Sequence, residues 1–383
     1  MERIAGECER VSAPRVLVLG NVFGTAKSGV LRHATEVLPR AAALLHSAGG
    51  ALEVLAGAAG LAPELALRLE SAPATVRPSD LPTGPPLRRA RAERRAVARV
   101  LRDAARTGSP FDLVHTGHLP VVRVPRGTAL CWMLHDLRQL DAHLVGPRRA
   151  FLARWLIPAS ARRADAIVCP SRAVASSLAA NTPPARGKTT AIWHGADHFE
   201  PLPREPGPGP LLHLGHLEPR KNIALLIRAL ATDPSLPELH LRGAAKGEEQ
   251  DRLATLARDL DVAARVHFHG PYPDAELPML LARAAAVVVP STVEGFGFAC
   301  IEALRAGVPL AVARAGALPE VAGPFSATFA SDAPDQAAAA IRFALKAPPS
   351  QLDRGRRHAA AFTWDRSAAR LTEAWTQACE PRA

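Results

Sequence analysis

Short apolar runs alternate with longer segments of helical periodicity along the first half of the chain. Runs typical of buried parallel strands lie at residues 15–20, 51–55, 112–115, 129–134, 166–170 and 189–193. Segments rich in helix-forming residues separate them, the first from about Val30 to Ser47. Alternating strands and helices predict a parallel sheet that helices cover on both faces, which is a doubly wound α/β domain.

The same alternation starts again after residue 210 and predicts a second α/β domain. A strand at 211–215 and a helix at 221–231 open it. Further strands are expected at 238–242, 266–269 and 286–289, and further helices at 244–260, 298–305, 337–346 and 364–378. Residues 200–210 are dense in proline and glycine, which is typical of a linker. We therefore predict domains at 1–200 and 211–361, joined by a linker at 201–210.

Two segments of the first half depart from the simple alternation. Residues 71–86 are rich in proline and polar residues and are predicted to be a loop. Residues 87–106 carry eight arginines and two acids, with an apolar stripe that includes Val97 and Leu101. Two interpretations of this helix stay open. It is either an ordinary amphipathic helix packed on the sheet, or a basic patch for a membrane surface or an anionic acceptor.

Composition narrows the class of protein. A chain of 383 residues, 48% of them apolar, suits two globular domains of ordinary size. Every apolar block is too short to span a membrane, and the start MERIAGECERVSAPR lacks the apolar core of a secretory signal. A cytoplasmic location is therefore expected. The five cysteines are scattered and form no Cys-x-x-Cys pair, so neither a disulfide framework nor a zinc site is predicted.

The formal charge of +11 is weak evidence for a nucleic-acid partner. Only five of the 47 basic residues are lysine, and arginine and alanine are abundant throughout, which indicates a compositional bias. Aromatic residues make up 4% of the chain, and no basic and aromatic residues interleave as in single-strand binding proteins. Nucleic-acid binding is not expected.

The most informative stretch runs from Ala286 to Gly307, AVVVPSTVEGFGFACIEALRAG. Its apolar start predicts a buried strand, and Gly295 and Gly297 predict a turn that lets backbone approach a ligand. The helix that follows would aim its free N–H groups at that ligand, and anions bind at such ends. Glu294 lies in the turn, and Glu302 is expected about two helical turns further along the same face.

Other candidate residues lie where parallel strands end. Arg220 and Lys221 are adjacent cations at the start of a predicted helix, which the helix dipole disfavours unless an anion lies between them. His135 and Asp136 follow the strand at 129–134, at the edge of the sheet where ligands of α/β proteins bind. A structural role for each of them is the alternative.

Two familiar cofactor motifs are absent from the sequence, and a familiar metal motif has another interpretation. The loop GNVFGTAKSG has neither P-loop spacing nor the Gly-x-Gly-x-x-Gly pattern of dinucleotide-binding proteins. The segment Asp259-Leu-Asp261 resembles an Asp-x-Asp metal motif, but it ends a predicted helix and is interpreted as a cap. No metal site and no cofactor are predicted.

The segment EGFGFACIEALRAGVPLAVARAGALPEVAG resembles the nucleotide-sugar site of glycosyltransferase family 4, the retaining enzymes of the GT-B fold. The matching residues are Pro290, Ser291, Glu294, Gly295, Phe296, Gly297, Glu302, Ala303, Gly307 and Pro309. The resemblance extends to Gly29, Arg32 and Glu36 near the first loop and to Arg220-Lys221-Asn222, the Arg-Lys-Asn type of the family. It departs from the family's pattern at His33 and His216. It is strong over 211–323 and moderate over 15–40 and 112–200.

This resemblance implies a fold and a chemistry. Two Rossmann-like domains would face each other across a cleft, and the last helix, 362–383, would pack back on the first domain. The enzyme would move a hexose from a UDP- or GDP-sugar to a hydroxyl acceptor with retention and without a metal ion. The acceptor would be a bacterial polysaccharide, a lipid-linked glycan or an aminocyclitol natural product. A GT-B epimerase and a non-catalytic partner subunit are the alternatives.

The resemblance also implies roles for individual residues. Glu294 and His135 would act on the donor sugar, Arg220 and Lys221 would hold its pyrophosphate, and Glu302 would bind the ribose. The other donor-binding residues would be Gly29, Ser291, Gly295, Phe296, Gly297 and Phe298. Asp136, His115 and His118 are expected on the acceptor side because they follow neighbouring strands.

Overall fold

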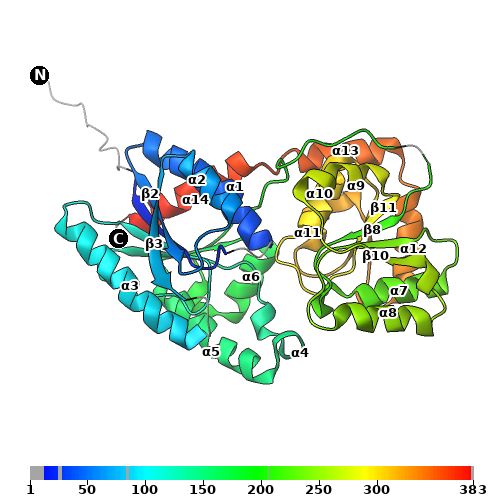
Figure 1. Ribbon diagram of the computed structural model, residues 1–383, viewed down its shortest axis with the longest axis horizontal. Coiled ribbons are helices and arrows are strands. Elements are labelled where there is room, and N and C mark those ends of the chain that lie inside the picture. Colours follow the sequence, from blue (N-terminus) through cyan, green and yellow to red (C-terminus); the bar gives the residue numbers. More distant parts are fainter. Residues whose placement is uncertain (1–12, 25–27, 83–85, 206, 381–383) are drawn as a thin grey trace, which may run out of the picture. The chain divides into compact units, whose positions relative to one another are not determined.

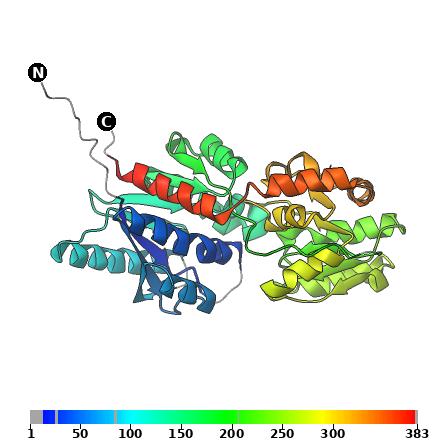
Figure 2. The same ribbon diagram turned by 90° about the horizontal axis from the view of Figure 1, so that it is seen from above.

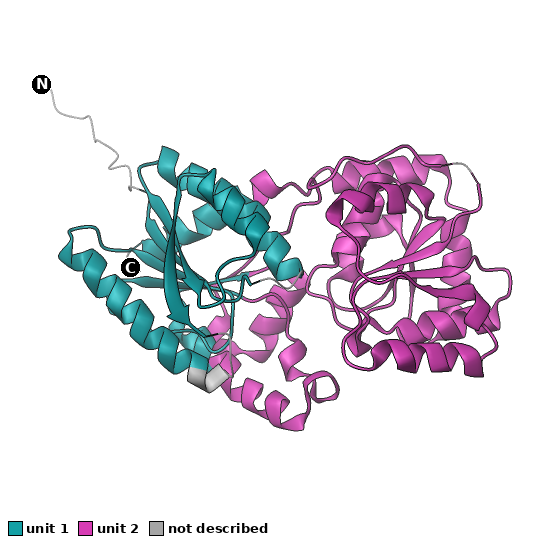
Figure 3. Ribbon diagram, viewed as in Figure 1, with its two compact units in different colours: residues 1–133, 159–168, 368–383 teal, residues 134–158, 169–367 magenta. Residues whose placement is uncertain are grey.

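The computed structural model describes residues 13–24, 28–82, 86–205 and 207–380. They form two compact units, which Figure 3 shows in different colours. The first comprises residues 1–133, 159–168 and 368–383, and the second comprises residues 134–158 and 169–367. The domain boundaries predicted at residues 200 and 211, and a cleft between the domains, stay predictions.

The first sheet has seven strands in the order β3-β2-β1-β4-β5-β6-β7. Its strands are β1 Arg15–Gly20, β2 Ala51–Gly57, β3 Ala74–Leu81, β4 Leu113–Thr116, β5 Ala129–Met133, β6 Ala166–Cys169 and β7 Thr189–Ala191. Neighbouring strands pair in parallel, as β1 does with both β2 and β4. The apolar run in β1 forms the centre of the core, with Val16 to Leu19 fully buried. Burial on both faces explains why this strand is continuously apolar.

The helices that connect these strands cover the sheet on both faces. They are α1 Gly29–Ser47, α2 Pro63–Glu70, α3 Pro86–Arg106, α4 Ala142–Val145, α5 Pro147–Arg163 and α6 Arg172–Asn181. Helices α1 and α2 lie side by side on one face, whereas the long helix α3 lies on the other (Figure 1). Val97 and Leu101 of α3 are buried, as the predicted apolar stripe requires.

The prediction of a loop at 71–86 is wrong, because residues 74–81 form strand β3. This strand pairs only with β2 and is therefore the edge of the sheet. An edge strand tolerates a proline such as Pro78, since one row of its backbone groups has no partner strand. Most of its residues are exposed, so it lacks the apolar run that identified the inner strands.

The second sheet has six parallel strands in the order β10-β9-β8-β11-β12-β13. They are β8 Leu211–Leu214, β9 Leu239–Arg242, β10 Val266–Phe268, β11 Ala286–Val289, β12 Leu310–Ala313 and β13 Ala327–Phe329. The helices are α7 Ile223–Thr232, α8 Glu249–Asp259, α9 Leu277–Arg283, α10 Phe298–Ala306, α11 Leu318–Ala322, α12 Pro334–Leu345 and α13 Pro349–Ala359. Helices α7, α8 and α12 cover one face, and α9, α10, α11 and α13 cover the other (Figure 1).

These two sheets confirm the predicted fold class of two doubly wound, Rossmann-like parallel sheets. The last helix, α14 Trp364–Cys379, extends over the first unit (Figure 2). Its Trp375 is fully buried and donates a hydrogen bond from Nε1 to Nδ1 of His115 at 3.1 Å. Among the described helices, none combines the length and the apolar character that crossing a membrane requires.

Candidate functional site

The site predicted from the sequence is built around the turn between β11 and α10. A second turn, the 3-10 turn Pro219–Lys221, is bound to it. The backbone N–H of Thr292 donates to the carbonyl of Arg220 at 2.9 Å, and the Asn222 side-chain amide donates to the carbonyl of Pro290 at 3.2 Å. These bonds bring together two motifs that lie about seventy residues apart in the sequence.

Arg220 and Lys221 do not lie at the first turn of a helix as expected. They belong to the 3-10 turn, and α7 starts only at Ile223. Asn222, between them and the helix, has the left-handed conformation with φ 52°. Asparagine is one of the few residues that adopts this conformation readily. The 3-10 turn ends at Asn222, and the chain changes direction there before α7. The two cations thereby face the turn at 290–297 rather than the end of α7.

Glu294 lies in a buried cluster of charges. Lys221 Nζ pairs with its Oε1, Arg220 Nη1 lies 3.3 Å from its Oε2, and Ser291 Oγ donates to Oε1 at 3.0 Å. Burial alone would raise the pKa of this carboxyl, but the charges of Lys221 and Arg220 outweigh it and lower the pKa to about 2. Glu294 is therefore ionised at neutral pH and accepts hydrogen bonds.

Glycines let backbone pass close to backbone in this turn. A Cβ on Gly295 would collide with the carbonyl oxygen of His135, so only glycine fits there. Gly297 has φ 94°, which favours glycine, and it caps the start of α10. Helix α10 therefore begins directly after the turn that carries Glu294 and touches the backbone of His135.

His135 lies at the end of a group of aromatic and imidazole rings that is centred on His194. The ring of His194 lies 6.3 Å from it and stacks on Phe298 at 5.2 Å with nearly parallel planes. Phe296 meets the same His194 ring edge-on at 4.9 Å. Burial, and secondarily the charge of Arg138, lower the pKa of His135 to about 4, and burial lowers the pKa of His194 well below its usual range. Both imidazoles are neutral at pH 7.

Glu302 faces a partner that the sequence analysis missed. Its Oε1 lies 3.0 Å from Nε2 of His198, and both side chains are buried. The expected spacing of two helical turns from Glu294 is wrong, because residues 294–297 are not helical and Glu302 lies one turn into α10. The two glutamates therefore have separate partners in separate parts of the site.

The residues expected on the acceptor side have well-defined partners. His118 Nε2 lies 2.7 Å from the buried Glu93, which also accepts from the Asn21 amide at 2.7 Å. His115 accepts the hydrogen bond from Trp375 that is described above. Asp136, in the other unit, accepts from the backbone N–H of Arg138 at 3.1 Å. The acceptor roles of these residues stay predictions.

Gly29 is the first residue of α1, whose N-cap Ser28 accepts from the N–H of Leu31 at 3.2 Å. The neighbouring residues 25–27 lie outside the described part of the chain.

Two of the residues that the sequence did not reveal share one signal. His194 and His198 follow strand β7, just as His135 follows β5. The rule that identified His135, a polar residue after a parallel strand, would have selected them too. Glu93 lies inside the arginine-rich helix α3, and its contact with His118 depends on tertiary packing.

Two family models match the chain and together cover most of it. Residues 28–200 match "Glycosyltransferase Family 4", and residues 196–360 match "Glycosyl transferases group 1".

Curated relatives match in part. A "MMP alpha-(1->4)-mannosyltransferase" from Mycolicibacterium hassiacum is 32% identical over 42% of this chain and 41% of its own. A "Glycogen synthase" from Mycobacterium tuberculosis is 32% identical over 53% of this chain and 50% of its own. A "D-inositol 3-phosphate glycosyltransferase" from Geodermatophilus obscurus is 34% identical over 45% of this chain and 41% of its own. The matches thus span half or less of these relatives.

Solved structures share the fold over nearly the whole chain. A sucrose-phosphate synthase from Thermosynechococcus elongatus has a TM-score of 0.73 at 19% identity and covers 95% of this chain and 98% of its own. Anabaena HepE, solved in complex with UDP and glucose, has a TM-score of 0.64 at 21% identity, with 94% and 98% covered. WaaG, described as a glycosyltransferase involved in lipopolysaccharide biosynthesis, has a TM-score of 0.66 at 17% identity, with the same coverage.

Proposed function

The chain belongs to the family 4 glycosyltransferases of the GT-B fold, and from this premise we propose that it transfers a hexose from a nucleoside diphosphate sugar to a hydroxyl acceptor. The observation that carries the proposal is the buried cluster of Lys221, Arg220 and Glu294 beside the start of α10. Cations, helix N–H groups and an ionised carboxylate are together what a sugar diphosphate requires.

The cluster supports different roles for its cations and its carboxylate. Arg220, Lys221 and the N–H groups of α10 bind the diphosphate and stabilise the negative charge that grows on it as the glycosidic bond breaks. A nucleoside diphosphate is a weak base, so its departure needs no general acid. Glu294, with a pKa of about 2, has no proton to give at neutral pH and accepts hydrogen bonds from the sugar hydroxyls.

His135 and Glu302 complete the proposed donor site. The backbone of His135 lies against Gly295 in the turn that follows Glu294, and its neutral imidazole would offer a hydrogen bond to the sugar without adding charge. Glu302, held by His198, offers an acceptor to the ribose hydroxyls. Ser291, Gly295, Phe296, Gly297 and Phe298 shape the surrounding surface in this proposal, and the donor-binding role of Gly29 stays a prediction. We propose transfer with retention, and no metal ion or cofactor, since the two cations already supply the charge stabilisation.

The donor and the acceptor are proposed as classes. UDP- and GDP-hexoses are the donors proposed, in line with the complex of HepE with UDP and glucose. A polysaccharide, a lipid-linked glycan or an aminocyclitol natural product is the proposed acceptor, and the cytoplasm is the proposed location. Nothing in the site or in the comparisons favours an epimerase or a non-catalytic subunit.

We also propose a peripheral membrane contact, and its main element differs from the basic helix 87–106 that the sequence suggested. Helix α3 exposes arginines, while its Val97, Val100 and Leu101 are buried. Helix α5 exposes Phe151 and Trp155, at 64% and 67%, next to Leu152 and three exposed arginines, Arg148, Arg149 and Arg154. Aromatic rings combined with arginines match an anionic lipid surface, so we propose that α5 provides a peripheral membrane contact, with the basic face of α3 as the alternative.

The donor proposal is tested with a panel of UDP-, GDP-, ADP- and TDP-hexoses. A donor should raise the melting temperature, and its hydrolysis or transfer should release the nucleoside diphosphate. If no member of the panel binds to the full chain, the proposed function is wrong. Lys346→Ala is a matched control for cation variants, because Lys346 is exposed at the end of α12 and lies outside the cluster.

A further inference from the structure

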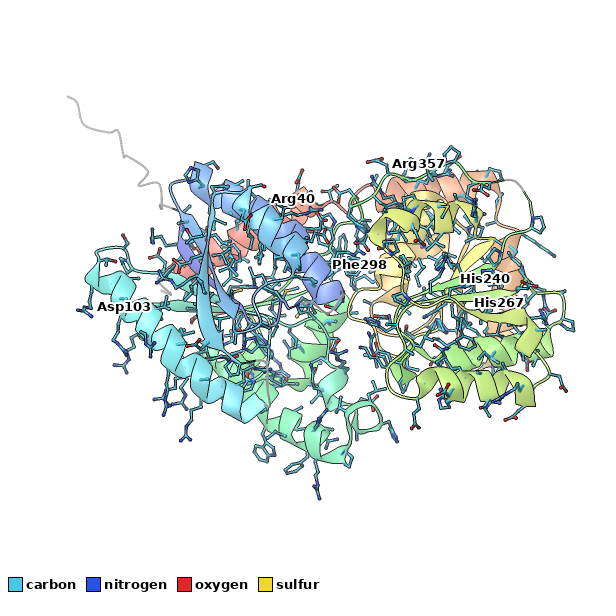
Figure 4. All side chains as sticks on the ribbon, in the orientation of Figure 1. Arg40, Asp103, His240, His267, Phe298 and Arg357 are labelled. Atoms are coloured by element: carbon cyan, nitrogen blue, oxygen red, sulfur yellow. The ribbon has the colours of Figure 1, made fainter. Side chains whose placement is uncertain are left out.

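Three side chains with metal-binding groups gather at the edge of the second sheet. Glu238 directly precedes β9, His240 lies in β9, and His267 lies in the edge strand β10. His240 and His267 are direct partners in the register of these parallel strands. Side chains two residues apart in a strand share a face, so Glu238 and His240 project to the same side. Figure 4 shows His240 and His267 next to each other on neighbouring strands.

The distances suit a single ion. Nε2 of His267 lies 3.0 Å from Oε2 of Glu238, and Nε2 of His240 lies 3.8 Å from the same oxygen. One ligand atom from each of the three residues lies within 4.8 Å of the others. Ligand atoms around a tetrahedral zinc ion, with bonds of about 2.0–2.1 Å, lie about 3.3 Å apart. Small side-chain rotations would therefore bring all three onto one ion.

A third imidazole lies beside the two histidines of the cluster. The rings of His240 and His267 are 4.8 Å apart and inclined to each other at 67°. His269, two residues beyond His267, lies with its ring 4.7 Å from that of His240 and is exposed. The nearby cation Arg242 lies 3.8 Å from Glu276, which offsets its charge.

We propose that Glu238, His240 and His267 form a binding site for a divalent transition-metal ion such as Zn²⁺ or Ni²⁺. Two imidazoles and a carboxylate are a ligand set that these ions favour, and the fourth position would go to water or His269. The spacing of the cysteines and the Asp-x-Asp segment predict no metal site in the sequence. The pairing of β9 with β10 brings these side chains together, and their spacing along the sequence does not show this.

The proposed ion would tie the edge strand β10 to β9. None of its ligands belongs to the donor cluster of Arg220, Lys221 and Glu294, so the ion would stabilise the second sheet rather than take part in transfer. A bound ion that contacts only the folded state raises the melting temperature as its concentration exceeds the Kd. At an ion concentration of about five times the Kd, a rise of about 2–4 °C is expected for a unit of this size.

The test is calorimetric titration of the full chain, stripped of metal and free of any histidine tag, with Ni²⁺ and with Zn²⁺. We expect one ion per chain. His240→Ala, His267→Ala and the near-isosteric Glu238→Gln should each weaken binding by at least about tenfold, no less than the loss of an outer-shell partner costs at other metal sites. Each should also remove the rise in melting temperature.

Two controls separate this site from ordinary metal-binding side chains. His46→Ala removes an exposed histidine of α1, and Cys379→Ser removes the half-buried thiol of α14. Both variants should bind the ion as the natural chain does. Binding that is unchanged in the three ligand variants, or that is lost with Cys379, would overturn the proposal, as would no binding at all. Glu238→Gln keeps the test valid if an alanine variant fails to fold, and because no donor is present, the outcome is independent of the proposed function.

Discussion

Lys221 Nζ is paired with Oε1 of Glu294 in the buried cluster of the second unit. The cation proposed to hold the diphosphate and the carboxylate proposed to hold the sugar therefore neutralise each other before a donor arrives. A buried pair of this kind strongly disfavours the loss of either partner, since the remaining charge is left unpaired. When a donor binds, Lys221 must contact the diphosphate and Glu294 must contact the sugar. Both contacts compete with the same ion pair, so they are linked energetically.

Lys221→Ala should weaken binding of the free nucleoside diphosphate by about tenfold or more, because a charge-assisted phosphate contact contributes roughly 1.5–3 kcal/mol. Isothermal titration calorimetry with UDP and GDP measures this. Lys346→Ala, the exposed control, should leave the affinity unchanged. Equal affinities for the natural chain and Lys221→Ala would refute the phosphate role of Lys221.

Glu294→Gln and Glu302→Gln should affect different kinetic constants. A contact to the sugar ring strengthens as positive charge develops in the transition state, so Glu294→Gln should lower kcat by about tenfold or more. The same change releases Lys221 from its partner, so the affinity for nucleoside diphosphate should stay the same or rise. Glu302 would contact the remote ribose equally in both states, so its loss should raise mainly KM.

Steady-state kinetics with the best donor distinguishes the two effects. His198→Ala provides a second check, because it removes the residue that holds Glu302 and should raise KM as well. The role assignment is reversed if Glu294→Gln abolishes nucleotide binding and leaves kcat intact.

Stability should fall as the pH drops from about 6.5 toward 4, partly because of His213. Burial, and secondarily the charge of Lys221, lower the pKa of this fully buried imidazole to about 4, whereas an unfolded histidine titrates near 6.5. Between about pH 6.5 and pH 4 the unfolded chain therefore binds more protons than the folded chain. The contribution of the neutral His213 to stability is complete above about pH 6.5 and is lost as the pH falls. The slope per group reaches at most about 1.4 kcal/mol per pH unit.

Urea unfolding at pH values from 7.5 to 5 measures that slope. His213→Asn should show a shallower pH dependence than the natural chain, while His46→Asn, at an exposed position, should not. Identical slopes in all three proteins would contradict a buried, neutral His213.

Glycosyl transfer should survive removal of divalent ions, because Arg220 and Lys221 already supply positive charge at the leaving group. Activity is measured in excess chelator after the protein has been stripped of metal. The proposed site at the edge of the second sheet makes the comparison informative, because His240→Ala should weaken zinc binding by at least about tenfold without lowering turnover. Loss of activity that magnesium or manganese restores would show that transfer depends on a metal.

Binding to vesicles containing phosphatidylglycerol should depend on α5. Phe151→Ser and Trp155→Ser each remove a large exposed ring and should weaken binding by about tenfold, since full burial of such a side chain contributes roughly 1.5–3 kcal/mol. Phe343→Ser, at 65% exposure on α12, is the matched control and should have no effect. Cosedimentation measures the affinity. If substitution of the α3 arginines abolishes binding and the α5 variants bind normally, the contact is through α3.

The inner strands could be predicted because burial on both faces makes them apolar, as in β1 and β11. Strand β3 could not, because an exposed edge strand with Pro78 follows no apolar pattern. The turn of Gly295 and Gly297 could be predicted from its glycines, which backbone crowding requires. The actual positions of Arg220 and Lys221 could not, since the left-handed Asn222 that ends their turn has no distinctive sequence pattern.

Contacts between side chains that lie far apart in the sequence could not be predicted either. That Lys221 pairs with Glu294, and Glu302 with His198, depends on which strands lie side by side. The exposed face of α5 was missed for a related reason. Its segment AFLARWLIP is mostly apolar, and only the structure distinguishes the buried Ala153 and Ile157 from the exposed Phe151 and Trp155.

The hydrogen bond from Trp375 to His115 has a consequence for biosynthesis. Trp375, Leu371 and Ala368 are buried with the first unit, although the ribosome makes them after the whole second unit. The first sheet consequently emerges with part of its core missing, and the second unit can fold before the first is complete. Nascent chains stalled before residue 364 should therefore expose apolar surface around β4 to chaperones, which full-length release would remove.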